Sequence, residues 1–215
     1  MKKGIISICV LLILVFGTLF FGRFPFAICL SVFAIFSLRE LLNIRGRDKK
    51  IPPEVEVLAY VIMIFFVTNN YDSDFDFYLL DYKLLAAIIL IDMLPLVLIN
   101  DKRKYTVVDA LYLMGSTLFI GVTFNLLVQL RNYDINYVIY IIFVAFFTDL
   151  FCFITGRYIG QRRIVPTISP KKTLEGALGG LIIGTFISSL FYMSTIPCTL
   201  SVTAIFLITM ALSLL

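Results

Sequence analysis

Long apolar runs recur along this whole chain, and they limit what it can fold into. Its residues are 60% hydrophobic and only 15% charged, whereas a soluble domain has about 45–50% apolar and about 25% charged residues. A soluble fold cannot bury that much apolar surface, but a bilayer accepts it if runs of about 20 apolar residues recur. The sequence therefore predicts one membrane-embedded domain over residues 1–215, with no soluble module attached.

Eight of these runs are candidate membrane spans. They cover residues 5–22, 24–42, 55–68, 84–100, 107–130, 137–156, 174–195 and 198–215. Backbone groups in lipid must be hydrogen-bonded within the segment, and none of the runs alternates as a β-barrel strand does. We therefore expect an all-α, polytopic transmembrane bundle of about eight spans. No small-residue cleavage site follows the first run, which favours an uncleaved helix over a signal peptide.

The basic residues orient this bundle in the membrane. With the N-terminus in the cytoplasm and alternating spans, 15 of the 18 Lys and Arg residues fall on the cytoplasmic side. The positive-inside rule predicts such a bias. The net charge of +4 is thus mostly a topology signal, and we expect membrane lipids but no nucleic acid as partners. The predicted location is the cell inner membrane.

Composition excludes several kinds of catalytic and metal site. The chain contains no His, so it holds no Ser-His-Asp or Cys-His nucleophilic site and no His-ligated zinc. Its four Cys residues match no zinc or disulfide spacing, and no GxxxxGK[ST] phosphate loop is present.

A carboxylate within a span and a basic loop after it mark the most informative stretch. Asp149 lies eight residues before Arg157, which places it about 12 Å below the cytoplasmic end of that helix at 1.5 Å per residue. Ionisable residues at such depth tend to face a cavity or a partner. The cytoplasmic loop of residues 157–173 then carries five basic residues and no acidic one.

The start of the following helix adds a third feature. Ser169 is a favoured N-cap and Pro170 a favoured first helical residue, which puts Lys171 and Lys172 in the first turn. The helix dipole disfavours cations there, and an anionic ligand would cancel that penalty. Free backbone N–H groups beside two ammonium groups are typical of a phosphate site. We therefore place a candidate anion site in the loop of residues 157–173.

Each of these features also has a purely structural interpretation. Asp149 could pair with Arg157, and the basic loop could reflect topology alone. The lysines could contact anionic lipid head groups without specificity. The glycines at 176, 180 and 184 more often mark close helix packing, within the chain or in a homodimer, than a ligand site. The functional interpretation depends on the joint occurrence of the acid, the loop and the helix start on one side.

The same stretch resembles the phosphatidate cytidylyltransferases, also called CDP-diglyceride synthases. The match extends over about 33 residues with consistent spacing. Its elements are Thr148-Asp149, Thr155-Gly156-Arg157, Gly160, Ser169-Pro170-Lys171-Lys172-Thr173, Glu175-Gly176 and Gly179-Gly180. The signature of that family, with S-x-x-K-R-x4-K-D, H-G-G and D-R-x-D elements, lies C-terminal to this region and is not found here. We therefore expect this sequence to correspond to the N-terminal three-quarters of such an enzyme.

The resemblance implies a nucleotidyltransferase of phospholipid biosynthesis that converts CTP and phosphatidate into CDP-diacylglycerol and pyrophosphate with Mg²⁺. It implies catalytic roles for Lys171 and Lys172, which would clamp phosphate oxygens. Asp149 would hold the metal or orient a lysine, and Glu175 would pair with Lys171 or with the metal. The expected substrate-binding residues are Arg157 (at the phosphatidate head group), Ser169, Thr173 and Gly176.

Two alternatives to this function remain open. A CTP-dependent polyprenol or dolichol kinase would phosphorylate its lipid and release CDP, whereas a cytidylyltransferase makes a CMP-containing lipid. A membrane transporter would use Asp149 and Asp92 to line an ion or proton path. The chain has no convincing internal repeat of the kind that transporters often contain.

Overall fold

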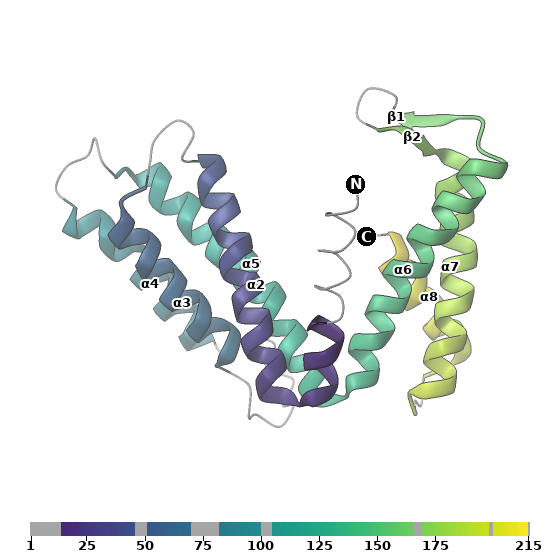
Figure 1. The fold of residues 1–215 in the computed structure, drawn as a ribbon, viewed down its shortest axis with the longest axis horizontal. Coiled ribbons are helices and arrows are strands. Elements are labelled where there is room, and N and C mark those ends of the chain that lie inside the picture. The colour runs from purple at the N-terminus through teal and green to yellow at the C-terminus, as the bar shows by residue number, and fades with distance from the viewer. Residues whose placement is uncertain are drawn as a thin grey trace. The chain divides into compact units, whose positions relative to one another are not determined.

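The computed structural model describes residues 14–45, 51–69, 82–99, 105–165, 169–197 and 200–214, without the side chains of residues 84, 165 and 169–171. The described chain is helical except for one β-hairpin and the connecting segments (Figure 1). It divides into two compact units, Met1–Tyr133 and Asp134–Leu215, and each is described here by itself.

The first unit is a bundle of helices. Residues 14–21 are helical and are followed by α2 (Arg23–Arg45), α3 (Pro53–Thr68), α4 (Tyr82–Leu98) and α5 (Val107–Tyr133). Ile62 and Phe66 of α3 pack with Ile88 of α4 in a buried cluster. Gly121 of α5 makes room for the ring of Phe66, since a Cβ at this glycine would lie 2.7 Å from Cε1 of that ring.

The second unit consists of three helices and the hairpin. Its elements are α6 (Ile135–Tyr158), β1 (Arg163–Val165), β2 (Ser169–Thr173), α7 (Leu174–Thr195) and α8 (Val202–Leu214). Buried Tyr140 and Val144 of α6 pack with Tyr192 of α7 and Ile205 of α8. The hydroxyls of Tyr140 and Thr209 lie 2.7 Å apart, so a buried hydrogen bond also joins α6 to α8.

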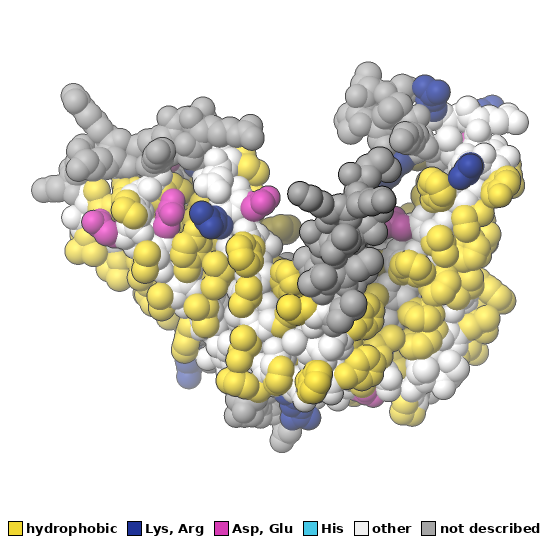
Figure 2. Space-filling model, viewed as in Figure 1, with side chains coloured by type: hydrophobic (Ala, Val, Ile, Leu, Met, Phe, Trp, Pro, Cys, Tyr) yellow, Lys and Arg dark blue, Asp and Glu magenta, His cyan; other side chains and the backbone are white. Residues whose placement is uncertain are grey.

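These helices confirm the predicted all-α membrane-type fold. Four of the described helices, α2, α5, α6 and α7, are long and apolar enough to cross a membrane. Shorter apolar helical stretches are Leu85–Leu98 within α4 and the whole of α8. Apolar side chains cover much of the surface of the described helices that Figure 2 shows, and large ones such as Phe146 are exposed. The count of eight spans stays a prediction, since residues 1–13 lie outside the described part. The single domain over residues 1–215 also stays a prediction beside the two observed units.

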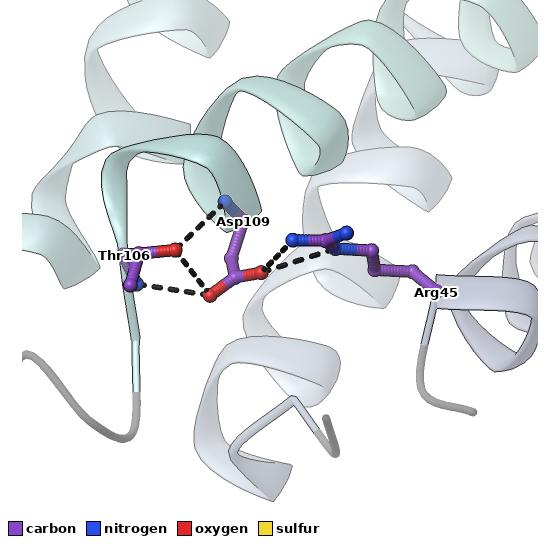
Figure 3. A network of polar contacts seen from close by, with 3 residues as sticks. All are labelled: Arg45, Thr106 and Asp109. Carbon is purple, nitrogen blue, oxygen red and sulfur yellow. Dashed lines mark hydrogen bonds and ion pairs between the residues drawn. The ribbon is translucent and has the colours of Figure 1, made fainter. Parts of the chain in front are cut away.

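A polar network ties the end of α2 to the start of α5 (Figure 3). Asp109 accepts hydrogen bonds from the backbone N–H of Thr106 (3.0 Å) and from its hydroxyl (2.6 Å). The N–H of Asp109 donates in return to the Thr106 hydroxyl at 3.4 Å, which is a reciprocal cap of the kind that begins many helices. Arg45 binds the other carboxylate oxygen through Nη2 at 3.0 Å and Nε at 3.2 Å.

Removing the Asp109 carboxylate should therefore destabilise the first unit. Asp109 is buried while the Arg45 side chain is 30% exposed. We expect Asp109→Ala to lower the free energy of unfolding by about 2–3 kcal/mol, because it removes the carboxylate half of the reciprocal cap and leaves a half-buried guanidinium unpaired. Titration with SDS in mixed micelles measures this loss. Asp109→Asn, which keeps the cap but not the charge, should lose less, and equal stability of Asp109→Ala and wild type would contradict the prediction.

Candidate active site

Glycines hold α6 and α7 in backbone contact. A Cβ at Gly180 would lie 2.7 Å from the carbonyl oxygen of Thr148, and one at Gly176 would lie 2.7 Å from that of Cys152. At Gly184 the added Cβ would lie 2.9 Å from the Cα of Thr148. These glycines therefore serve helix packing within the chain, and they no longer argue for a homodimer.

The start of α7 differs from the prediction. Thr173, not Ser169, is the N-cap, and its hydroxyl accepts a hydrogen bond from the N–H of Gly176 at 3.2 Å. Pro170 and the two lysines lie in β2, so their predicted place in the first turn of the helix is wrong.

The hairpin explains why the helix begins later. β2 pairs antiparallel with β1 through Val165↔Ser169 and Arg163↔Thr173, which keeps the chain extended up to Thr173. A two-stranded hairpin has free edges, where a proline such as Pro170 is tolerated. The first turn then contains Glu175 in place of lysines, and the positive end of the helix dipole favours that negative charge. The predicted loop of residues 157–173 is thus a helix end followed by a hairpin.

A pocket of about 530 Å³ lies where α6 meets the end of β2. Its lining residues are Asp149, Cys152, Phe153, Gly156, Arg157, Lys172 and Thr173. The five lining residues of α6 are spaced three or four apart or adjacent, which puts them along one side of the helix. The fold therefore brings together four of the predicted site residues, Asp149, Arg157, Lys172 and Thr173, in one cavity.

The charges of this pocket are free to meet a ligand. Arg157 and Lys172 are exposed at its rim, and Asp149 is exposed two helical turns deeper along α6. Among the described residues, the side chains of these three residues have no hydrogen-bond or ion-pair partner. The structural interpretation in which Asp149 pairs with Arg157 is therefore not what the described part of the chain shows.

Glu175 and Gly176 lie beside this pocket without lining it. The carboxylate of Glu175 accepts hydrogen bonds from the backbone N–H groups of Gln161 and Arg162, both at 3.1 Å. Gly176 is buried, and its carbonyl accepts a hydrogen bond from the Thr155 hydroxyl at 3.1 Å. Their predicted catalytic and substrate-binding roles stay predictions. The side chains of Ser169 and Lys171 lie outside the described part of the structure.

Sequence reasoning had not assigned roles to three residues near the site. Cys152 and Phe153 line the pocket. The hydroxyl of Thr155 on α6 donates a hydrogen bond to the carbonyl of Gly176 in the first turn of α7. Cys152 and Phe153 follow Asp149 by three and four residues, the spacing that places side chains on one helix face. That spacing was therefore a usable signal for both lining residues.

The pocket offers one carboxylate for a divalent cation. The described residues contain no cluster of three His, Cys, Asp or Glu side chains that would enclose a metal. Mg²⁺, however, is commonly held by one or two carboxylates together with substrate phosphates and water. Asp149, exposed in the pocket and free of other partners among the described residues, fits that kind of ligand set.

Comparison with known proteins agrees with the resemblance that the sequence motifs indicate. A family model described as "Cytidylyltransferase family" matches residues 2–215. A phosphatidate cytidylyltransferase of Staphylococcus saprophyticus is 26% identical over 215 residues, which cover 100% of this chain and 80% of that protein. One of Bacillus subtilis is 26% identical over 196 residues, or 88% of this chain and 69% of that protein. One of Staphylococcus haemolyticus is 24% identical over 214 residues, or 100% of this chain and 80% of that protein.

Proposed function

Because this chain belongs to the cytidylyltransferase family, we propose that it transfers the cytidylyl group of CTP to phosphatidate. The products are CDP-diacylglycerol and pyrophosphate, as the names of the similar bacterial proteins suggest. The observation that carries this proposal is the pocket that Arg157, Lys172 and Asp149 line beside the hairpin, since it holds two cations and a carboxylate next to the membrane helix α6.

Catalysis of this reaction mainly requires that the negative charge of the reactants is neutralised and that the reacting groups are aligned. A phosphate oxygen of phosphatidate forms a bond to the α-phosphorus of CTP, and the bond from that phosphorus to the bridging oxygen breaks, so that pyrophosphate leaves. Both reactants are anions, and positioning together with electrostatic stabilisation supplies most of the catalysis in such transfers. Two exposed cations at one pocket rim are suited to that task.

The walls of the pocket favour a lipid phosphate as one of its occupants. Arg157 and Lys172 stand at the end of the membrane helix α6, and Cys152 and Phe153 lie between them and Asp149 along the pocket. We assign Arg157 to the phosphatidate head group and Lys172 to phosphate oxygens, while Thr173 shapes the rim. Lys171 and Ser169 remain candidates for the same anion, on the prediction from the sequence.

Mg²⁺ is proposed as the cofactor. When bound, it would neutralise phosphate charge and help to align the reacting groups. Among the described residues, Asp149 would hold it, with the remaining ligands from substrate phosphates and water. The protein's own contribution is then to present Asp149 to the metal ion, and Arg157 and Lys172 to the phosphate oxygens, within one pocket.

The membrane location is proposed in more detail than the helices alone establish. The chain has the helices of a multi-pass membrane protein, and we propose the cell inner membrane, with the hairpin in the cytoplasm. The exposed Arg157, Arg162, Arg163 and Lys172 support this orientation, since cytoplasmic loops carry an excess of basic residues. A homodimer stays a prediction.

Isotope position in the products tests the proposed reaction. Purified protein in detergent with phosphatidate, Mg²⁺ and CTP labelled at the α-phosphate is expected to give labelled lipid and free pyrophosphate. Label that enters the lipid only from γ-labelled CTP, with release of CDP, would identify a lipid kinase instead. Folded protein that makes neither product, but takes up a solute in proteoliposomes, would overturn the proposal in favour of a transporter. Asp92, the second acid of that alternative, is fully buried; the Thr117 hydroxyl donates to one of its oxygens, and the other oxygen has no partner among the described residues.

A further inference from the structure

The carboxylate of Glu175 holds the segment that leads from α6 into the hairpin. One of its oxygens accepts N–H groups of Gln161 and Arg162 at 3.1 Å, and the other lies 3.3 Å from the same N–H of Arg162. The N–H of Leu174 donates to the carbonyl of Arg162 at 2.8 Å, so the two segments are tied in both directions. Hydrogen bonds to an ionised acceptor are about twice as strong as neutral ones.

A second contact closes the same segment against the start of α7. A Cβ at Gly160 would lie 2.8 Å from Cγ2 of Thr173, so this glycine lets the backbone approach the helix cap. Residues 160–162 therefore touch Thr173 through Gly160 and Glu175 through the two amides. The segment begins three residues after Arg157, and it contacts the three residues that follow Lys172.

Along the chain, residues 160–162 lie between the two cations of the pocket rim. Arg157 belongs to the end of α6, and Lys172 belongs to β2, so the way in which residues 160–162 are held contributes to the separation of their side chains. Without the Glu175 bonds, two backbone N–H groups lose their partners and the segment can move away from α7. The distance between the cations would then vary, and a phosphate that must meet both would bind less well.

We propose that Glu175 is a positioning residue that sets the spacing of Arg157 and Lys172 across the pocket by holding residues 160–162 through their backbone amides. This rests on the proposed function only for the identity of the anion that binds there. Both oxygens of Glu175 face backbone donors and the side chain does not line the pocket, which favours a positioning role over direct contact with a substrate. Glutamine retains a carbonyl oxygen that can accept from both amides, but alanine has no acceptor.

Hydrogen exchange on the full chain in detergent tests the structural part. In Glu175→Ala, the amides of Gln161 and Arg162 are expected to exchange at least about 10-fold faster, the effect of losing about one hydrogen bond each. Glu175→Gln should stay within about 3-fold of wild type. The matched control is Glu54→Ala, which removes a first-turn carboxylate from α3 and should leave these amides unchanged. Unchanged exchange in Glu175→Ala would overturn the proposal.

Steady-state kinetics separates positioning from chemistry. Glu175→Ala should raise the KM for CTP or phosphatidate about 10-fold with a smaller change in kcat. The reason is that the two cations would bind the phosphate less well in the ground state and in the transition state alike. Glu175→Gln should recover most of that loss. If kcat falls as far in Glu175→Gln as in Glu175→Ala, the carboxylate takes part in the reaction and the proposal is wrong. If wild type makes no CDP-diacylglycerol, the proposed function fails, while the exchange experiment still decides the role of Glu175.

Discussion

Replacing Asp149 by Asn is expected to lower the rate of CDP-diacylglycerol formation at least about 100-fold while leaving membrane insertion intact. Loss of one electrostatic group from an active site commonly costs this much, because no water takes over its place and geometry. Asp149 is exposed in the pocket without a partner among the described residues, so its removal breaks no packing. A carboxylate kept within a membrane helix under those conditions is better explained by a ligand than by stability. The measurement is kcat/KM with labelled CTP.

A second carboxylate of the same unit provides the matched control. Asp134 caps α6 by accepting the N–H of Asn136 at 3.0 Å, and asparagine is an equally good cap. Asp134→Asn therefore removes the same charge next to the same helix and should stay within about 2-fold of wild type. Near-normal turnover in Asp149→Asn, or an equal loss in both variants, would remove Asp149 from the site.

Adding a single methyl group at Gly180 should separate α6 from α7. The Cβ would lie 2.7 Å from the carbonyl oxygen of Thr148 and 2.9 Å from the backbone N of Cys152. Both are backbone atoms, so they move only if the helices move, and overpacking of this kind costs about 1–3 kcal/mol. We expect Gly180→Ala to lower the free energy of unfolding by about 2–3 kcal/mol, measured by SDS titration, and to lower activity because Cys152 lines the pocket.

Gly115 of α5 is the matched control for that substitution. Among the described residues, no heavy atom outside the neighbouring turns of α5 lies within 4 Å of the Cβ that alanine would add there. Because alanine favours the helix over glycine by about 1 kcal/mol, Gly115→Ala should leave stability unchanged or raise it slightly. An equal loss of stability in Gly115→Ala and Gly180→Ala would show that the close contact of α6 and α7 is not the cause.

The helices of this chain were predictable from the sequence because lipid leaves the backbone few options. An apolar run within a bilayer must bond its own N–H and C=O groups, so run length and position predict helix position. The run predicted over 137–156 corresponds to α6, Ile135–Tyr158, and the run predicted over 174–195 corresponds to α7, Leu174–Thr195. The candidate pocket was predictable in part for a related reason. Helix periodicity alone places Asp149 on the same side of α6 as Cys152, Phe153 and Gly156.

The error at Ser169 and Pro170 shows where local signals stop being sufficient. This dipeptide is typical of a helix start, but it also fits the edge of a hairpin. The pairing of β2 with β1 decided between the two, and that pairing involves residues that are apart in the chain. The N-cap of α7 in the structure is Thr173, with the carboxylate of Glu175 in the first turn.

The sequence by itself thus determined an all-α membrane fold, the positions of its helices and the family, since each depends on local runs and on one stretch of about 33 residues. Only the tertiary structure decided that Thr173 and not Ser169 caps α7, that Lys172 reaches the pocket of Asp149, and that Glu175 binds backbone amides. These outcomes depend on contacts between segments: a two-stranded ladder, and a helix pair whose glycines permit backbone contact. The spacing of the glycines is visible in the sequence, but the helix that they contact and the strand that β2 pairs with are set by the packing of the whole unit.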